Sequence, residues 1–292
     1  MNEHPIYEHL RDALRTERPV ALATITAVSA EGGPRVGAKL LVEPGGTVLG
    51  SLGDPDLDRV VGRDALGELE SGLTATRHYG AHGEAREDTV SVFIESFAPP
   101  PRMVIFGAVD FTRALANVAK VLGYRVAVCD ARAVFATRQR FPMADDVVNE
   151  WPDRYLEKIG DELGPRDAVC VLTHDTKFDV PAIVGSLATR VGYLGAMGSR
   201  RTHDKRTQRL REAGVTDEQL ARIHAPIGLD IGGRTPEETA ISICAEIIAN
   251  RTGRIPKALR DTSGPIHDQQ GRDHDADPSA ANADAPAAQG GS

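Results

Sequence analysis

A repeated order of apolar strand, turn and helix begins after the prolines at 99–101 and constrains the fold more than any other feature. The segments that we predict as strands are 103–108, 125–131, 168–174 and 191–197. Almost every residue in them is apolar, and such segments are typical of strands in a parallel sheet that is covered on both faces.

Helical spacing of apolar residues appears between and after these strands. The predicted helices are 111–122, 201–213 and 235–250. Parallel strands need crossover connections, and helices supply them. We therefore expect an α/β fold in which residues 101–255 form a Rossmann-type parallel-sheet domain.

A smaller α+β domain is expected over residues 1–98. Its first helix is predicted from the spacing of Ile6, Leu10 and Ala13, and a second helix is predicted at 54–72. The predicted strands are 20–29, 36–42, 46–52 and 88–97. After the second domain, residues 256–292 are rich in Asp, Gly, Ala and Ser, and we expect a disordered C-terminal tail there because so little apolar surface could be buried.

Composition excludes several classes of protein. The chain has 34 basic and 42 acidic residues, for a formal net charge of −8, so it lacks the basic field that nucleic-acid binding requires. No apolar run approaches the roughly 20 residues of a membrane span, and the first residues contain no apolar leader segment. We therefore expect a cytoplasmic protein with no nucleic-acid partner and no membrane span.

The three cysteines, Cys129, Cys170 and Cys244, are odd in number, lack CxxC spacing and lie within apolar segments. This pattern argues against a disulfide framework and against a structural zinc site, and no metal site is predicted. Small buried thiols are the expected role for all three.

Ligands of doubly wound sheets bind beyond the carboxyl ends of the strands, so strand-end residues are the candidates for a site. The first turn keeps only Gly107 of the GxGxxG dinucleotide pattern. Val109 carries a Cβ where a pyrophosphate needs bare backbone, and Asp110 brings negative charge near that phosphate, so simple NAD binding is disfavoured. Asp130 ends the second strand, where a ribose-binding acid would lie, and Arg132 follows closely. Asp130 could instead pair with Arg132 or cap a helix, and both interpretations stay open.

The third strand ends in Thr173, His174 and Asp175. An imidazole beside carboxylates is suited to proton transfer or to metal binding. Alternatively, Asp175 starts a helix near 179–181 and His174 donates a hydrogen bond to the backbone. No nucleophile is placed to complete a triad, so no catalytic residue is predicted.

The fourth strand leads through Gly195, Gly198, Ser199 and Arg200 into a basic helix. Glycines allow close backbone approach, and Ser199, Arg200 and the helix N-terminus supply donors for an anion. A glycine turn followed by a solvated charged face is the structural alternative.

A capping box begins the last helix, with Thr235 at the N-cap, Pro236 in the first turn and Glu238 three residues after the cap. Gly232 and its neighbour Gly233 precede it, and their amides offer a second anion contact in the same crevice.

Several segments, taken together, resemble a known family in type, order and spacing. The motifs are FGA, LGYRVAVCDAR, FATRQRFPMADDVV, VLTHDTKFD, YLGAMGSRRT and GLDIGGRTPEETAISICAEIIA. They resemble the C-terminal domain of the XdhC/CoxI family over most of 102–254. The segment ALATITAVSAEGGPRVGAKLLVEPGGTVLGSLGDPDLDRVV is similar to the N-terminal portion of the same family.

The resemblance implies an accessory protein of molybdenum hydroxylases such as xanthine dehydrogenase or CO dehydrogenase. Such a protein binds molybdenum cofactor, a phosphate-bearing pterin, and helps to deliver its sulfurated form. The implied role is that of a cofactor-insertion chaperone rather than an enzyme. The implied partners are the hydroxylase apoenzyme, a cysteine desulfurase and a second copy of the chain.

The chain departs from the family at two places. Relatives typically carry a Gly-Gly-Cys sequence where residues 50–58 read GSLGDPDLD, so a thiol-based step at that position is in doubt. Relatives also carry a Gly-Ala-Gly-His turn where this chain has Val109 and Asp110. Two other functions stay open. The Rossmann pattern and Asp130 motivate an NAD(P)-binding oxidoreductase, and the two departures permit a non-catalytic assembly module that has lost cofactor binding.

Overall fold

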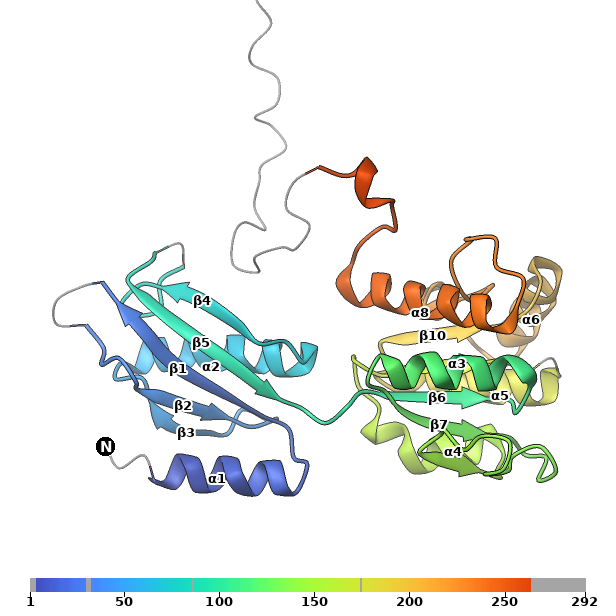
Figure 1. The fold of residues 1–292 in the computed structure, drawn as a ribbon, viewed down its shortest axis with the longest axis horizontal. Helices are drawn as coiled ribbons and strands as arrows, with labels where there is room; N and C mark the ends of the chain where they lie inside the picture. Colours follow the sequence, from blue (N-terminus) through green and yellow to red (C-terminus); the bar gives the residue numbers. More distant parts are fainter. Residues whose placement is uncertain (1–3, 30–32, 86, 174, 264–292) are drawn as a thin grey trace, which may run out of the picture.

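The computed structural model consists of two lobes joined at residues 98–101 (Figure 1). The residues that the structure describes are 4–29, 33–85, 87–173 and 175–263. The predicted α/β fold class is confirmed, with an antiparallel sheet in the first lobe and a parallel sheet in the second. The predicted tail lies outside the described residues from 264 onward, and its described part, 256–263, is exposed.

The first lobe is a five-stranded antiparallel sheet in the order β3-β2-β1-β5-β4, with one helix against each face. Its elements are α1 His4–Arg15, β1 Val20–Val28, β2 Lys39–Val42, β3 Val48–Ser51, α2 Pro55–Ser71, β4 Ala75–Tyr79 and β5 Val90–Phe97. Alternate residues of β1 point to opposite faces, so Ala21 and Ala23 pack with α2 while Val20 and Leu22 pack with α1.

Strand β4 was not predicted, because its sequence ATRHY contains too few apolar residues to indicate a strand. It forms an edge of the sheet and pairs with β5 alone. Its Arg77 donates two hydrogen bonds, of 2.8 and 2.6 Å, to the buried carboxylate of Glu68 on α2. Tertiary contacts thus stabilise a strand that local sequence does not indicate.

The second lobe is a six-stranded sheet in the order β11-β10-β9-β6-β7-β8, in which all pairs are parallel. Its strands are β6 Arg102–Phe106, β7 Arg125–Cys129, β8 Asp146–Val148, β9 Ala168–Val171, β10 Tyr193–Ala196 and β11 Ile223–His224. This is the strand order of a dinucleotide-binding Rossmann fold, with the first strand of the lobe, β6, and the fourth, β9, side by side.

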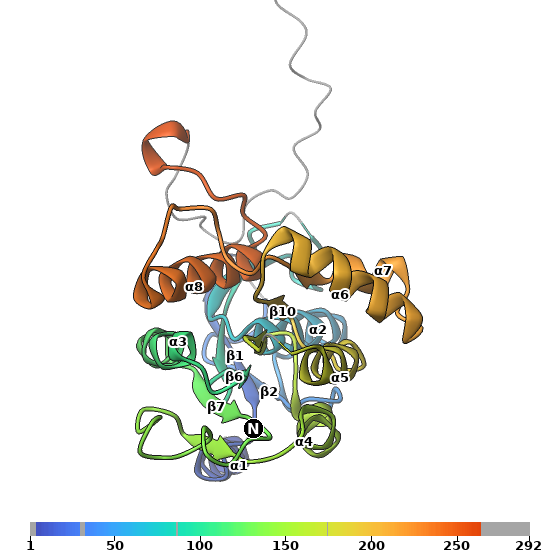
Figure 2. The same ribbon diagram turned by 90° about the vertical axis from the view of Figure 1, so that its right-hand side faces the viewer.

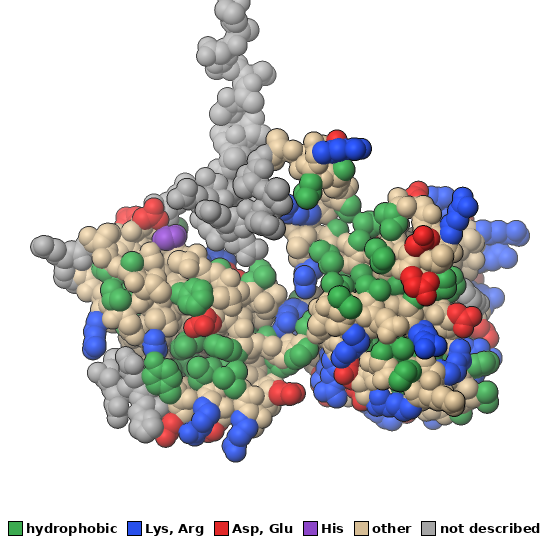
Figure 3. Space-filling model, in the orientation of Figure 1, with side chains coloured by type: hydrophobic (Ala, Val, Ile, Leu, Met, Phe, Trp, Pro, Cys, Tyr) green, Lys and Arg blue, Asp and Glu red, His purple; other side chains and the backbone are tan. Residues whose placement is uncertain are grey.

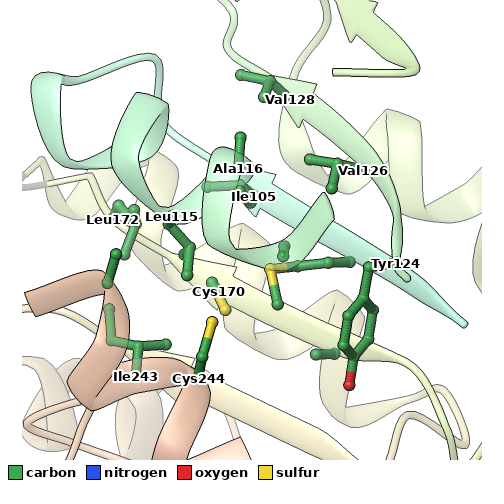
Figure 4. Packing of buried hydrophobic residues seen from close by; sticks show 14 of the residues in the cluster. Ile105, Leu115, Ala116, Tyr124, Val126, Val128, Cys170, Leu172, Ile243 and Cys244 are labelled. Atoms are coloured by element: carbon green, nitrogen blue, oxygen red, sulfur yellow. The ribbon is translucent and has the colours of Figure 1, made fainter. Parts of the chain in front are cut away.

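Helices cover both faces of this sheet, as the end-on view in Figure 2 shows. They are α3 Asp110–Val121, α4 Pro152–Ile159, α5 Thr176–Leu187, α6 Arg200–Glu212, α7 Asp217–Ala221 and α8 Pro236–Thr252. Helices α3 and α8 pack on one face, and α4, α5 and α6 pack on the other. Figure 4 shows the first of these cores, where the thiols of Cys170 and Cys244 point toward one another among apolar side chains. None of the helices in the described part of the chain is long and apolar enough to cross a membrane.

The connections from β6 and β9 run to opposite faces of the sheet, through α3 and α5 respectively. In folds of this class, ligands bind at such a reversal, beyond the carboxyl ends of the two strands. The linker enters at the amino end of β6, so the carboxyl ends of the parallel strands face away from the first lobe (Figure 1).

Candidate ligand-binding site

The turn between β6 and α3 packs directly against the end of β9. Gly107 has a φ of +107°, and a Cβ there would lie 2.7 Å from Thr173 Cγ2 and 3.0 Å from its backbone nitrogen. The amides of this turn are already used within the protein: Gly107 donates to the Cys129 carbonyl at 2.9 Å, and Val109 donates to the Thr112 hydroxyl at 3.4 Å. With the Ala108 amide bound to Asp130, none of the amides of residues 107–109 is free to bind a pyrophosphate.

Asp130 is buried at the end of β7, and all its acceptor positions are occupied. Oδ1 accepts from the Arg132 amide and Nε, both at 2.9 Å, and Oδ2 accepts from Arg132 Nη2 and the Ala108 amide, both at 2.8 Å. Burial opposes ionisation, but the hydrogen bonds from Arg132 and Ala108 outweigh it and hold the pKa of Asp130 below its ordinary value. The carboxylate has no free lone pair for a ribose hydroxyl, so its observed role is the pairing with Arg132.

Beyond β9, Thr173 is part of a buried polar cluster that includes a residue the sequence analysis did not select. The Thr173 hydroxyl donates to Asp179 of α5. The Arg206 guanidinium of α6 reaches the same carboxylate, with Nε 3.2 Å and Nη2 2.9 Å from Asp179 Oδ2. Nη2 also donates to the Met197 carbonyl at 2.7 Å. The side chains of Asp179 and Arg206 are both only 1% exposed, so the ion pair is buried.

Arg206 retains one donor without a partner, because Nη1 is buried and has no hydrogen-bond acceptor in the protein. A buried donor of this kind is costly unless a ligand or water accepts from it. In the sequence, Arg206 is one of several basic residues of a polar helix, and only the packing of α6 shows that it is buried.

The N-terminus of α6 lies beside this guanidinium. Ser199 is the N-cap and accepts from the Thr202 amide at 3.2 Å, while the Arg200 side chain is exposed in the first turn. Gly198 precedes the cap with a φ of +145°, and a Cβ there would lie 3.5 Å from Arg206 Nη2. The first amides of a helix have no acceptor within the helix and attract anions. Gly198, Ser199 and Arg200 are thus brought together, with Arg206 beneath them.

Gly195 does not join this group. It lies inside β10, where its backbone pairs with the neighbouring strands, and a Cβ would lie 2.5 Å from the side chain of Ile227. Its glycine identity is explained by packing.

Asp175 caps α5 and His174 lies outside the described residues. Asp175 accepts from the Lys177 amide at 3.1 Å and lies 3.2 Å from Lys177 Nζ. The backbone hydrogen bond from Lys177 holds its pKa below the ordinary value. Asp175 therefore acts as a helix cap, as the structural alternative predicted. The helix α5 begins at Thr176, earlier than the expected start near 179–181. Among the described residues, no group of three or more His, Cys, Asp or Glu is arranged to hold a metal ion.

Gly232 lies in an exposed loop before α8, with a φ of +76°. The predicted capping box forms after it, with Thr235 accepting from the Glu238 amide at 3.2 Å. The first residues of α8 and of α3 line a common cavity of about 360 Å³. Gly232 thus belongs to the α3 side of the sheet, whereas α6 covers the other side.

Comparison with known proteins matches both lobes to one family. Residues 103–247 match the XdhC Rossmann domain, and residues 13–80 match the XdhC and CoxI family. The chain belongs to the XdhC and CoxI family.

Three relatives of this XdhC/CoxI chain are informative. An uncharacterized Escherichia coli protein, YqeB, is 32% identical over 239 residues, which is 79% of this chain and 43% of YqeB. A probable xanthine dehydrogenase component of Bacillus subtilis is 34% identical over 56% of this chain and 47% of its own length. The molybdenum cofactor insertion chaperone PaoD of Escherichia coli is 28% identical over 54% of this chain and 43% of its own length. The chain thus matches less than half the length of each relative.

Proposed function

We propose that this chain is an accessory protein of a molybdenum hydroxylase of the xanthine dehydrogenase or CO dehydrogenase type. In this proposal it acts in the cytoplasm, where it binds molybdenum cofactor and assists the sulfuration and insertion of that cofactor into the apoenzyme. The family and the names of the Bacillus and PaoD relatives support the accessory role.

The observation that carries cofactor binding is the buried Arg206 guanidinium. Its Nη1 has no acceptor, and its Nη2 lies 3.5 Å from the position that a Cβ of Gly198 would take, just before the N-terminus of α6. A phosphate at this position would accept from Arg206, from the first amides of α6 and from the Arg200 side chain. These groups suit the phosphate of a pterin cofactor, because all of them are hydrogen-bond donors and the two arginines also carry positive charge.

The chain's own residues favour binding and delivery over sulfur transfer by a thiolate. Burial raises the pKa of Cys129 and of Cys244 to about 12, and it also raises the pKa of Cys170. Residues 50–58 contain no cysteine. Because thiolates are the nucleophilic form of cysteine, we propose that a partner such as a cysteine desulfurase supplies the sulfur.

A homodimer is part of the proposal because the family resemblance implies a second copy of the chain. The C-terminal end of α2, at Gly72, contacts Arg166 of the second lobe, whereas residues 50–54 precede the other end of this 17-residue helix. The helix is about 25 Å long at a rise of about 1.5 Å per residue. Residues 50–54 therefore lie far from the crevice of their own chain, and only the crevice of a second copy could lie close to them.

The test is an anaerobic titration of the protein with molybdenum cofactor, NAD and NADP in parallel, with retained molybdenum measured after gel filtration. We expect cofactor to be retained and neither nucleotide to bind, because the amides of the β6–α3 turn and the oxygens of Asp130 are already used. Retention of none of the three would favour an assembly module without a cofactor.

Substitution of Arg200 tests the position of the phosphate. Arg200→Ala should weaken cofactor binding by about 10- to 150-fold, the range for loss of one charge-assisted hydrogen bond. Arg211→Ala is the matched control, since it removes the same charge from the exposed last turn of the same helix. Equal affinities of the two variants would remove Arg200 from the site.

A further inference from the structure

Two aromatic side chains, Trp151 and Phe178, contact one another at the carboxyl edge of the parallel sheet, and the Arg132 guanidinium links a third, Phe135, to Phe178. Phe135 follows β7, Trp151 follows β8 as the N-cap of α4, and Phe178 lies in the first turn of α5. The Trp151 and Phe178 ring centroids are 5.0 Å apart at an interplanar angle of 45°. The whole chain has one tryptophan and seven phenylalanines, so three of these eight rings gather at one edge.

Three cations accompany the rings. The Arg140 guanidinium lies 5.5 Å from the centroid of Phe135. The Arg132 guanidinium lies 4.5 Å from the centroid of Phe135 and 5.9 Å from that of Phe178. Lys177 Nζ lies 4.8 Å from the centroid of Phe178. The Arg132 guanidinium donates two hydrogen bonds to the Asp130 carboxylate, which hold the plane of the guanidinium in a fixed orientation. We call Arg132, Phe135, Trp151, Lys177 and Phe178 the aromatic platform.

Core packing explains only part of the platform. Phe178 is buried, with 6% of its surface exposed, whereas Phe135 is 39% and Trp151 43% exposed. Within the described residues, no other phenylalanine or tryptophan is among the exposed large apolar side chains. Exposed ring surface costs free energy in water, about 25 cal/mol per Å², and stacking of a planar ligand would remove that cost.

The platform and the α6 anion site adjoin through two consecutive residues of α5. Phe178 faces Arg132 and Trp151, while the next residue, Asp179, pairs with Arg206 below the N-terminus of α6. The charges of Arg132 and Lys177 are matched by Asp130 and Asp175, and that of Arg140 by Asp110. The platform is therefore suited to a flat ring system, and the α6 end is suited to the anion.

We propose that the aromatic platform stacks the planar heterocycle of a ligand whose phosphate lies at the N-terminus of α6. This inference rests on the proposed function for the phosphate position and extends it by assigning the ring. A pterin and a nucleobase share this chemistry, and the experiment separates them.

Trp151 supplies the readout, because it is the only tryptophan of the chain. Its fluorescence is followed during anaerobic titration with molybdenum cofactor, and with AMP and NAD in parallel arms, while retained molybdenum is measured on the same samples. We expect molybdenum cofactor to quench Trp151 along the same saturation curve as molybdenum retention.

Phe135→Ala should weaken binding by about 5- to 150-fold, the range for loss of one ring from a stack. Phe135→Tyr keeps a ring and should restore most of the affinity. Val134→Ala is the control, since Val134 is the neighbouring residue and is 81% exposed. Circular dichroism and thermal unfolding of each variant show whether the fold is retained.

The outcomes separate the platform from the proposed function. Molybdenum retention without quenching, or with equal affinity for wild type and Phe135→Ala, would overturn the platform and leave the cofactor function standing. Quenching by AMP or NAD alone, lost in Phe135→Ala, would support the platform for a nucleobase and overturn the cofactor function. Absence of binding in every arm would overturn both.

Discussion

At the carboxyl end of β7, Asp130 accepts four hydrogen bonds, three of them from Arg132. A single residue pair therefore closes the position at which a dinucleotide fold holds ribose, and it also orients the guanidinium against Phe135. Arg206 likewise has two roles. It stabilises the end of β10 by donating to the Met197 carbonyl, and its Nη1 has no acceptor in the protein. At this scale, the role of a charged residue follows from which of its atoms already have partners.

Arg132→Ala should lower the free energy of unfolding at neutral pH by about 1–2 kcal/mol, a value reduced for the partial exposure of Arg132. The folded-state pKa of Asp130 lies below its ordinary value of 3.8. Its stabilisation is therefore fully present above that pH and is lost as the pH falls through the folded-state pKa. Urea unfolding at several pH values should show the difference between wild type and variant shrinking below about pH 4. A difference that stays constant with pH would contradict the pairing.

Among the elements, the β6–α3 turn and β9 show how a glycine sets the distance between strand ends. Gly107 combines a positive φ with close contact to Thr173. Gly123, which follows α3, has a φ of +81° and no atom within 4 Å of its Cβ position. Both glycines thus have a positive φ, but only Gly107 has neighbouring atoms where a Cβ would lie.

Substitution of both glycines separates the two effects. Gly123→Ala should lower the free energy of unfolding by about 1–2 kcal/mol, because a residue with a Cβ is strained in a left-handed backbone conformation. Gly107→Ala should lower the free energy of unfolding by at least about 1 kcal/mol more than Gly123→Ala does, because the Thr173 side chain and backbone must also move. Urea unfolding of both variants measures the difference. Equal destabilisation would mean that the strand ends do not approach as closely as the structure shows.

Over the whole molecule, the linker forms a narrow waist between the lobes (Figure 3). A cavity of about 540 Å³ lies between them, lined by residues of the linker, by Leu66 and Leu69 of α2 and by Arg166. This cavity is at the amino ends of the parallel strands, opposite the proposed site. The contact between the lobes and the proposed ligand site thus lie at opposite ends of the parallel strands.

Arg166→Ala tests this separation. Arg166 lies against Gly72 and donates to the Pro99 carbonyl at 3.0 Å, so its loss should loosen the contact between the lobes. Small-angle scattering should then show a broader range of dimensions, while the affinity for cofactor should stay at the wild-type value. A marked fall in affinity would show that the first lobe contributes to the site.

The sequence by itself determined the class of fold. Apolar runs predicted four strands of the parallel sheet, because strands buried on both faces need no polar side, and the third of them ends at Val171 rather than at residue 174. Capping residues placed α8 almost to the residue, since Thr235, Pro236 and Glu238 act locally. Strands β4 and β8 escaped prediction because they are short edge strands, stabilised by a neighbour that lies elsewhere in the sequence.

Only the tertiary structure decided which of the candidate residues meet. The strand order brings Thr173 and the segment from Gly198 to Arg200 to one edge, and it leaves Gly195 in the core and Gly232 on the other side of the sheet. Arg206 and Trp151 gave no signal in the sequence, since one is a basic residue in a basic helix and the other is a single aromatic residue. Their roles depend on burial and on neighbours distant in the chain, and these are properties that local patterns do not encode.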